Sequence, residues 1–144
     1  MKTPFAIIGW CEQVHFPELG GCTIKAKVDT GADTSALHAW KITPFEKDGE
    51  DWVSFEVHPN QKTKEGKLQC EARVLTQKDI KSSNGQIESR YTIRTTAIIG
   101  QHDYPVDLTL TNRDEMGFRM LLGRKAIKGR FLVDCAHSYI QSQS

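Results

Sequence analysis

Apolar and polar residues alternate along most of the chain, and this alternation predicts β-strands. It is clearest over residues 22–28, 68–74 and 104–110, where every second residue is apolar. Residues 53–57 and 91–97 continue the same pattern. Because side chains two positions apart point to the same face of a strand, each segment offers one face to a core and one to water.

Turn-forming residues separate these segments at short intervals. They are Pro17 with Gly20 and Gly21, Lys47-Asp48-Gly49, Pro59-Asn60, Ser83-Asn84-Gly85, and Asn112 with Gly117. Asn84-Gly85 lies between two strand-like segments, which favours a tight hairpin tip. The best helical segment is short, residues 124–128 after Gly123. Many short strands with turns at this spacing predict an all-β fold, either a barrel or a sandwich.

Length and composition narrow the class of protein. The 144 residues contain no repeat, linker or low-complexity segment, so residues 1–144 are expected to form a single domain. With 19 Lys and Arg against 18 Asp and Glu, the net charge of +1 argues against a nucleic-acid partner. The longest apolar stretch, residues 5–11, is too short to cross a membrane and has no signal-peptide features. Four cysteines without a Cys-x-x-Cys pair indicate reduced thiols, and we expect a cytoplasmic protein.

Two short motifs carry the candidate chemistry. Asp29 ends an apolar strand and is followed by Thr30 and Gly31, so the chain turns directly after a carboxylate. Such an aspartate is either the acceptor of an ordinary Asx-turn or a functional group held at the mouth of a barrel. In the second motif, an apolar pair precedes Gly123, Arg124 and the short helical segment. This motif by itself is compatible with a core strand that ends in a bend.

In this order, with a glycine-tipped hairpin between them, the two motifs resemble the retropepsin-like aspartic peptidases. Residues 29–33 and 121–124 match the motifs of that family residue for residue, and the Asn84-Gly85 hairpin corresponds to its flap. Nearly the whole chain looks like a bacterial group of this clan that is labelled ATP-dependent zinc protease. The matching segments include residues 8–10, 25–32, 34–39, 70–72, 90–95, 110–114 and 118–124. The resemblance implies a closed six-stranded acid-protease barrel with one short helix near the C-terminus.

The resemblance also assigns roles to residues. Asp29, Thr30 and Gly31 are the expected catalytic turn; the residues expected near the substrate are Ala32, Asp33, Asn84, Gly85 and Arg124. Asp33 is expected to pair with Arg124. Aspartic peptidases use two facing carboxylates that share one proton, and this chain has one Asp-Thr-Gly, so a homodimer through this region is expected. Ala32 has no hydroxyl to donate to the outer carboxylate oxygen, so we expect an activity optimum nearer neutral pH than in relatives with serine there.

The segment between the two motifs differs from that of the viral relatives. It is longer, with an extra strand pair expected around residues 40–57, and residues 82–86 at the flap are polar. The extra strands could cover the edge through which viral subunits pair, and the polar flap carries over no peptide preference.

Other functions compete with proteolysis by a carboxylate. A zinc-dependent protease, as in the group's label, has His38, His58 and Cys70 as its weak candidate ligands, but the chain has no His-Glu-x-x-His motif and no phosphate-binding loop, so no metal and no cofactor is expected. The resemblance associates the group with ATP-grasp glutamate ligases, which build acidic tails on proteins. Accordingly, the alternatives are a peptidase acting on glutamate-rich protein tails and a non-catalytic peptide-binding or scaffold module for such a ligase. The basic residues Arg124, Lys125, Lys128 and Arg130 are either a solvated surface or a landing site for an acidic peptide.

Overall fold

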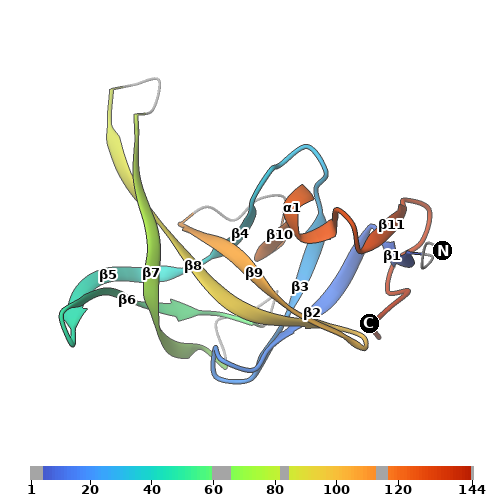
Figure 1. Cartoon of the computed structure of the whole chain (residues 1–144), viewed down its shortest axis with the longest axis horizontal. Coiled ribbons are helices and arrows are strands. Elements are labelled where there is room, and N and C mark those ends of the chain that lie inside the picture. The colour runs from blue at the N-terminus through green and yellow to red at the C-terminus, as the bar shows by residue number, and fades with distance from the viewer. Residues whose placement is uncertain (1–4, 60–65, 82–84, 113–116, 144) are drawn as a thin grey trace.

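The structure, a computed structural model, describes residues 5–59, 66–81, 85–112 and 117–143 (Figure 1). Its strands are β1 (Ala6–Gly9), β2 (Cys11–Phe16), β3 (Cys22–Val28), β4 (Ser35–His38), β5 (Trp40–Lys47), β6 (Glu50–Val57), β7 (Leu68–Lys81), β8 (Ile87–Ile99), β9 (His102–Thr111), β10 (Met120–Leu122) and β11 (Phe131–Asp134). The helix α1 (Arg124–Ile127) follows β10. No helix in the described ranges is long and apolar enough to cross a membrane.

Six strands close into a barrel. They are hydrogen-bonded in the order β2, β3, β10, β4, β9, β8, and β8 returns to β2 where His15 pairs with Ile98. The predicted all-β class, the six-stranded closed barrel and the short helix near the C-terminus are therefore confirmed. Closure matters for the edges of the sheet, because a closed barrel satisfies the backbone groups that an open edge would expose.

The sheet continues beyond the barrel. Strands β7, β6 and β5 follow β8 in order, and the β5–β6 hairpin is the extra strand pair expected from the sequence. The β7–β8 hairpin is long, 14 and 13 residues in its two strands, and its outer part projects away from the barrel (Figure 1). It is the hairpin predicted around Asn84-Gly85.

The alternation in the sequence fills the interior. In β9 the side chains of Tyr104, Val106, Leu108 and Leu110 are buried, while Pro105 between them is exposed. Strand β6 likewise buries Val53, Phe55 and Val57 completely. Each large apolar side chain moved fully out of water contributes about 1.5–3 kcal/mol to the free energy of folding, so this pattern is the main stabilising feature of the fold.

A buried carboxylate fixes the C-terminal segment. Glu12, on the core-facing side of β2, is completely buried. Its carboxylate accepts hydrogen bonds from the backbone N–H groups of Gly9 (2.7 Å), Ile140 (2.9 Å), Gln141 (3.1 Å) and Ser142 (3.0 Å), and from the Ser142 hydroxyl (2.6 Å). A charge without solvent needs such partners. Glu12 therefore ties residues 140–142 to the start of the chain.

A small parallel sheet lies outside the barrel, at the end of the molecule where both chain ends are drawn (Figure 1). It consists of β1 and β11, with Ile7 opposite Leu132 and Ile8 opposite Val133. Ile8 and Phe131 point inward and are buried. The side-chain amide of Gln141 donates to the Ile7 carbonyl (2.7 Å), so the C-terminal segment runs beside this sheet.

Candidate functional site

The Asp29 turn begins where β3 ends. The Asp29 N–H donates to the Leu122 carbonyl of β10 (2.9 Å), which places the residue at the rim of the barrel. Its carboxylate Oδ1 accepts from the Gly31 N–H (3.1 Å), and its carbonyl accepts from the Ala32 N–H (3.2 Å). Asp29 is half-buried, whereas Thr30 and Gly31 are exposed. The Asx-turn is thus present, and it holds a carboxylate in one orientation at an accessible edge.

Strand β10 supports this turn from behind. It lies between β3, to which it is parallel, and β4, to which it is antiparallel. Gly123 then passes very close to the chain after the turn: a Cβ atom there would lie 2.6 Å from the backbone carbonyl carbon of Thr34. The Gly123 N–H donates to the Ser35 hydroxyl (2.9 Å). Only glycine allows this approach, which explains its place in the motif.

Arg124 and Asp33 connect the two motifs, as the family resemblance implied. The Arg124 N–H donates to the Ala32 carbonyl (2.7 Å), and its guanidinium donates to the Thr30 carbonyl (3.0 Å) and to Asp33 Oδ1 (3.3 Å). Lys125 Nζ lies 3.5 Å from Asp33 Oδ2. These ion pairs are more than half exposed, so each stabilises the fold by no more than about 1 kcal/mol. Their effect is to fix the direction of the turn, and contact with a substrate stays a prediction.

A cleft of about 360 Å³ lies between the β7–β8 hairpin and the turn. Thr34 and Lys125 line it on the side of the turn, and Lys78 and Arg90 line it on the hairpin. Its carboxylate is Asp107, which Arg94 holds through two contacts, 2.8 and 3.3 Å. The hydrogen bond and the charge of Asp107 raise the pKa of Arg94.

Lys78 and Arg90 lie directly opposite each other in the hairpin. Like charges at opposed positions destabilise a strand pair. The Glu88 carboxylate offsets the charge of Arg90 only weakly, because it lies 3.7 Å from Arg90 Nε. Sequence reasoning missed both residues. A two-residue turn at Asn84-Gly85 would place Lys78 opposite Tyr91. The register of the structure pairs Lys81 with Ile87 instead, so the pairing of Lys78 with Arg90 did not follow from the sequence.

At the hairpin tip, Asn84 lies outside the described residues. Gly85 is exposed and has a positive φ of 86°, a conformation that glycine adopts without strain. The strands below the tip are paired as far as Lys81 and Ile87. A role of Asn84 and Gly85 in substrate binding stays a prediction.

The three weak candidates for zinc are not brought together. The rings of His38 and His58 both stack on Trp40, at centroid distances of 3.8 and 3.7 Å, so the indole separates them. His58 Nε2 instead contacts the Glu56 carboxylate at 2.8 Å, and this hydrogen bond lowers the pKa of Glu56. No group of three or more His, Cys, Asp or Glu side chains in the described part of the chain is arranged to hold a metal ion.

Cys70 belongs to the core. It is buried beside Cys22, and burial raises the pKa of its thiol. Burial and the neighbouring Cys70 also raise the pKa of Cys22, to about 11. A thiol binds metal or attacks as the thiolate, so both groups are chemically quiet at neutral pH.

Comparison with known proteins identifies the family and the relatives of this chain. A model of the RimB-like family, described as retropepsin-like aspartic endopeptidase RimB, matches residues 7–144. The chain belongs to the RimB-like family. A solved structure with the same fold is a Legionella pneumophila protein of unknown function, 29% identical, with a TM-score of 0.77 over 94% of this chain and 98% of that one.

Curated relatives of this RimB-like chain are longer proteins. A probable alpha-L-glutamate ligase of Shewanella halifaxensis is 52% identical over 137 residues, which are 95% of this chain and 30% of that protein. A protein of the same name from Parasynechococcus marenigrum is 49% identical over 128 residues, 89% of this chain and 28% of that protein. The chain thus spans less than a third of the length of these relatives.

Proposed function

We propose that this chain is an aspartic-type peptidase in which the Asp29 carboxylate activates water. The observation that carries the proposal is the turn itself: a carboxylate held by the Gly31 N–H at the accessible rim of a closed barrel, with Arg124 bracing the same loop. Membership of a family described as aspartic endopeptidases supports it.

The chemistry requires a second carboxylate, which a second copy of the chain would supply. One carboxylate takes a proton from water as the oxygen attacks the scissile carbonyl carbon, and the other, protonated, donates to the carbonyl oxygen. The C–N bond then breaks, and the leaving nitrogen takes a proton from the dyad. Thr30 and Gly31 are exposed and so accessible to the partner copy. Two such carboxylates titrate as a pair.

For the substrate, we propose glutamate-rich peptide segments. Among the described residues that line the cleft next to the turn, Lys78, Arg90 and Lys125 are cations and Asp107 is the carboxylate. An unfavourable pairing of two cations in a hairpin is offset when an anion binds between them. The names of the longer relatives support association with a glutamate ligase, whose products such a peptidase would shorten.

Charge reversal on the hairpin tests this substrate class. Lys78→Glu is expected to lower kcat/KM for a glutamate-rich peptide by about tenfold at low salt, and the loss should shrink as salt screens the charges. The matched control is Lys67→Glu, which makes the same charge change at an exposed residue just before the other end of β7. This variant should leave kcat/KM nearly unchanged. Equal losses in both variants, measured by initial rates across a salt series, would contradict a specific role for Lys78.

Cleavage of a mixed peptide pool, followed by mass spectrometry between pH 4 and 8, tests the proposed activity. We expect new termini within glutamate-rich peptides and an optimum nearer neutral than acid, because Ala32 offers no hydroxyl to the carboxylate. An optimum below about pH 4, the range of an ordinary carboxyl group, would refute the expected pH dependence. If the protein bound the acidic peptides and cleaved none, it would be the non-catalytic binding module. The sequence is compatible with that alternative, because each chain has one Asp-Thr-Gly and an aspartic peptidase needs two.

A further inference from the structure

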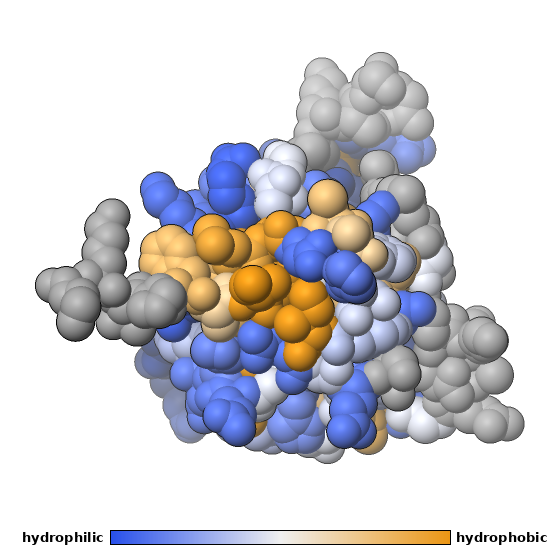
Figure 2. Space-filling view, turned by 90° about the vertical axis from the view of Figure 1, so that its right-hand side faces the viewer, coloured by the Kyte–Doolittle hydropathy of each residue, from blue (hydrophilic) through white to orange (hydrophobic). Residues whose placement is uncertain are grey.

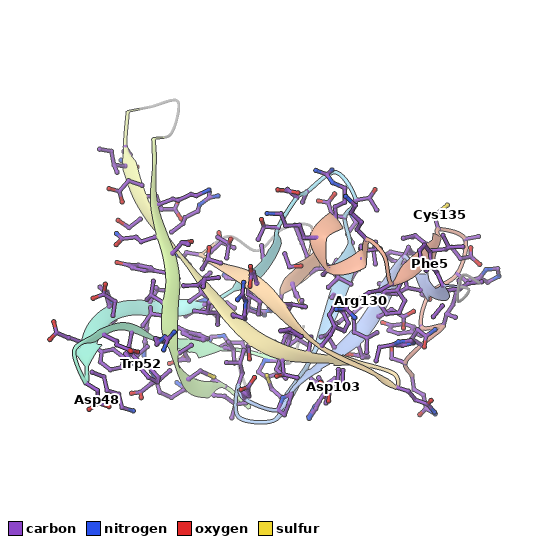
Figure 3. The ribbon with its side chains drawn as sticks, in the orientation of Figure 1. Phe5, Asp48, Trp52, Asp103, Arg130 and Cys135 are labelled. Carbon is purple, nitrogen blue, oxygen red and sulfur yellow. The ribbon has the colours of Figure 1, made fainter. Side chains whose placement is uncertain are left out.

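The outer face of the β1–β11 sheet is apolar and exposed. Ile7 and Leu132 are cross-strand partners, and their side chains are 47% and 57% exposed. Phe5, two residues before Ile7 along the chain, is 48% exposed. We call these three residues the terminal patch. Figure 2 shows a continuous hydrophobic area on this side of the molecule, and Figure 3 places Phe5 at this end.

Such a surface differs from the scattered apolar residues of an ordinary protein surface. Ile87 is even more exposed, at 69%, but it lies on the projecting hairpin, on a different element. The terminal patch instead lies on two paired strands, β1 and β11. The neighbouring residues in these strands, Ile8 and Phe131, point to the opposite face and are buried in the core. Contiguous exposed apolar area rimmed by polar residues marks interaction surfaces.

We propose that the terminal patch docks the glutamate-ligase portion that accompanies this domain in the longer relatives. In the Shewanella halifaxensis protein the matched segment is 30% of the chain, so the remaining 70% (100 − 30) belongs to the same polypeptide. The proposal rests on the association with a ligase proposed above, and it is independent of the chemistry of Asp29.

The position of the patch relative to the two ends of the fold supports this occupant. Strand β1 is the first element of the chain, and Gln141, near its end, is bonded to Ile7 of the patch. Additional chain joined at either end would therefore begin next to the terminal patch. A surface adjacent to the point of attachment meets the attached portion at high effective concentration, so even a modest apolar contact would be occupied.

The patch is also preformed. Glu12 holds residues 140–142 through buried hydrogen bonds, and these residues run beside β1. The sheet that presents Ile7 and Leu132 is thus fixed before any partner arrives, which lowers the ordering cost of docking.

Hydroxyl-radical footprinting tests the proposal. The two samples are this chain alone and a chimera in which it replaces the matched segment of the full Shewanella halifaxensis protein. We expect side-chain oxidation of Ile7 and Leu132 to fall at least fivefold in the chimera, while oxidation of Ile87 stays unchanged as the matched control. Equal oxidation of the patch in both samples would overturn the proposal.

A variant separates this surface from the proposed peptidase activity. Leu132→Glu places a charge on an exposed position, so the fold should be retained, and in the chimera it should restore oxidation of Ile7. In the isolated chain the same variant should cleave glutamate-rich peptides at the wild-type rate, so failure of the activity and failure of the docking are distinguishable. If the isolated chain alone protects the patch as its concentration rises, a second copy is the occupant and the ligase proposal is refuted.

Discussion

Asp29→Asn is expected to abolish peptide cleavage. Asparagine keeps the size of the side chain and can still accept from the Gly31 N–H through its amide oxygen, so the turn should persist. It cannot take a proton from water, and loss of a general base costs roughly 10²–10⁴-fold in rate. In a symmetric dimer both copies lose the group together, so we expect a loss at the upper end of this range. The measurement is the initial rate on the glutamate-rich peptide cleaved by the wild type.

Asp48→Asn is the matched control for this experiment. Asp48 lies at the tip of the β5–β6 hairpin, outside the barrel that carries the Asp29 turn (Figure 3). Its positive φ of 52° is a conformation that asparagine tolerates well. This variant should cleave as the wild type does. If Asp29→Asn retained more than a tenth of the activity at an unchanged melting temperature, the chemistry would have to lie elsewhere.

Glu12→Ala is expected to be the most destabilising single substitution among the carboxylates described. It removes the acceptor of five donors, four backbone N–H groups and the Ser142 hydroxyl, most of them in the C-terminal segment. A buried donor that is left without its acceptor costs about 1–3 kcal/mol. Because the released C-terminal segment can turn most of its N–H groups to water, the five contributions do not add in full, and we expect a loss of about 3–5 kcal/mol in the free energy of unfolding and a melting temperature about 10 °C lower or more.

The control for Glu12 is Glu18→Ala. Glu18 accepts from the Thr96 N–H (2.7 Å) and lies near the Thr95 hydroxyl (3.4 Å), but it is exposed. Hydrogen bonds with the side chain and the backbone N–H of Thr96, and a weaker one with Thr95, lower the pKa of the Glu18 carboxyl. Water can replace Glu18 at its partners, so the cost should be about 1 kcal/mol or less. Similar losses in both variants, by urea unfolding, would show that residues 140–142 are not held by Glu12.

The all-β class was predictable because the alternation of apolar and polar residues marks the buried face of each strand. The closed six-stranded barrel was implied by the family resemblance. Alternation in residues 22–28 and 104–110 maps onto β3 and β9 with the predicted face inward. Strand β2 was missed, since its core-facing positions include Glu12, a charge that a pattern of apolar residues excludes. A carboxylate in phase with Val14 and Phe16 is a signal for a buried anchor. Four of its five donors, however, lie about 130 residues away, and no local pattern identifies them.

The site was predictable only in part, for a similar reason. The motifs at Asp29 and Gly123 are contiguous in sequence, and the Asp33–Arg124 contact follows from the resemblance. The cleft depends on register: Lys78 and Arg90 become neighbours only through the pairing of two long strands. The opposite error concerns His38 and His58, which the sequence analysis grouped as weak candidate zinc ligands. In the structure the Trp40 ring lies between them, and no sequence pattern indicates this stacking.

The position of β10 has a consequence for how the protein is made. Its three residues separate β3 from β4, so Met120 pairs with Ala26, 94 positions earlier (120 − 26), and with Leu37. During synthesis the edges of β3 and β4 stay unpaired until residues 120–122 leave the ribosome, and contacts so distant in sequence form slowly. The Asp29 turn, which bonds to Leu122, cannot be assembled on a shorter nascent chain. The proposed active-site turn therefore cannot form until residues 120–122 have been translated.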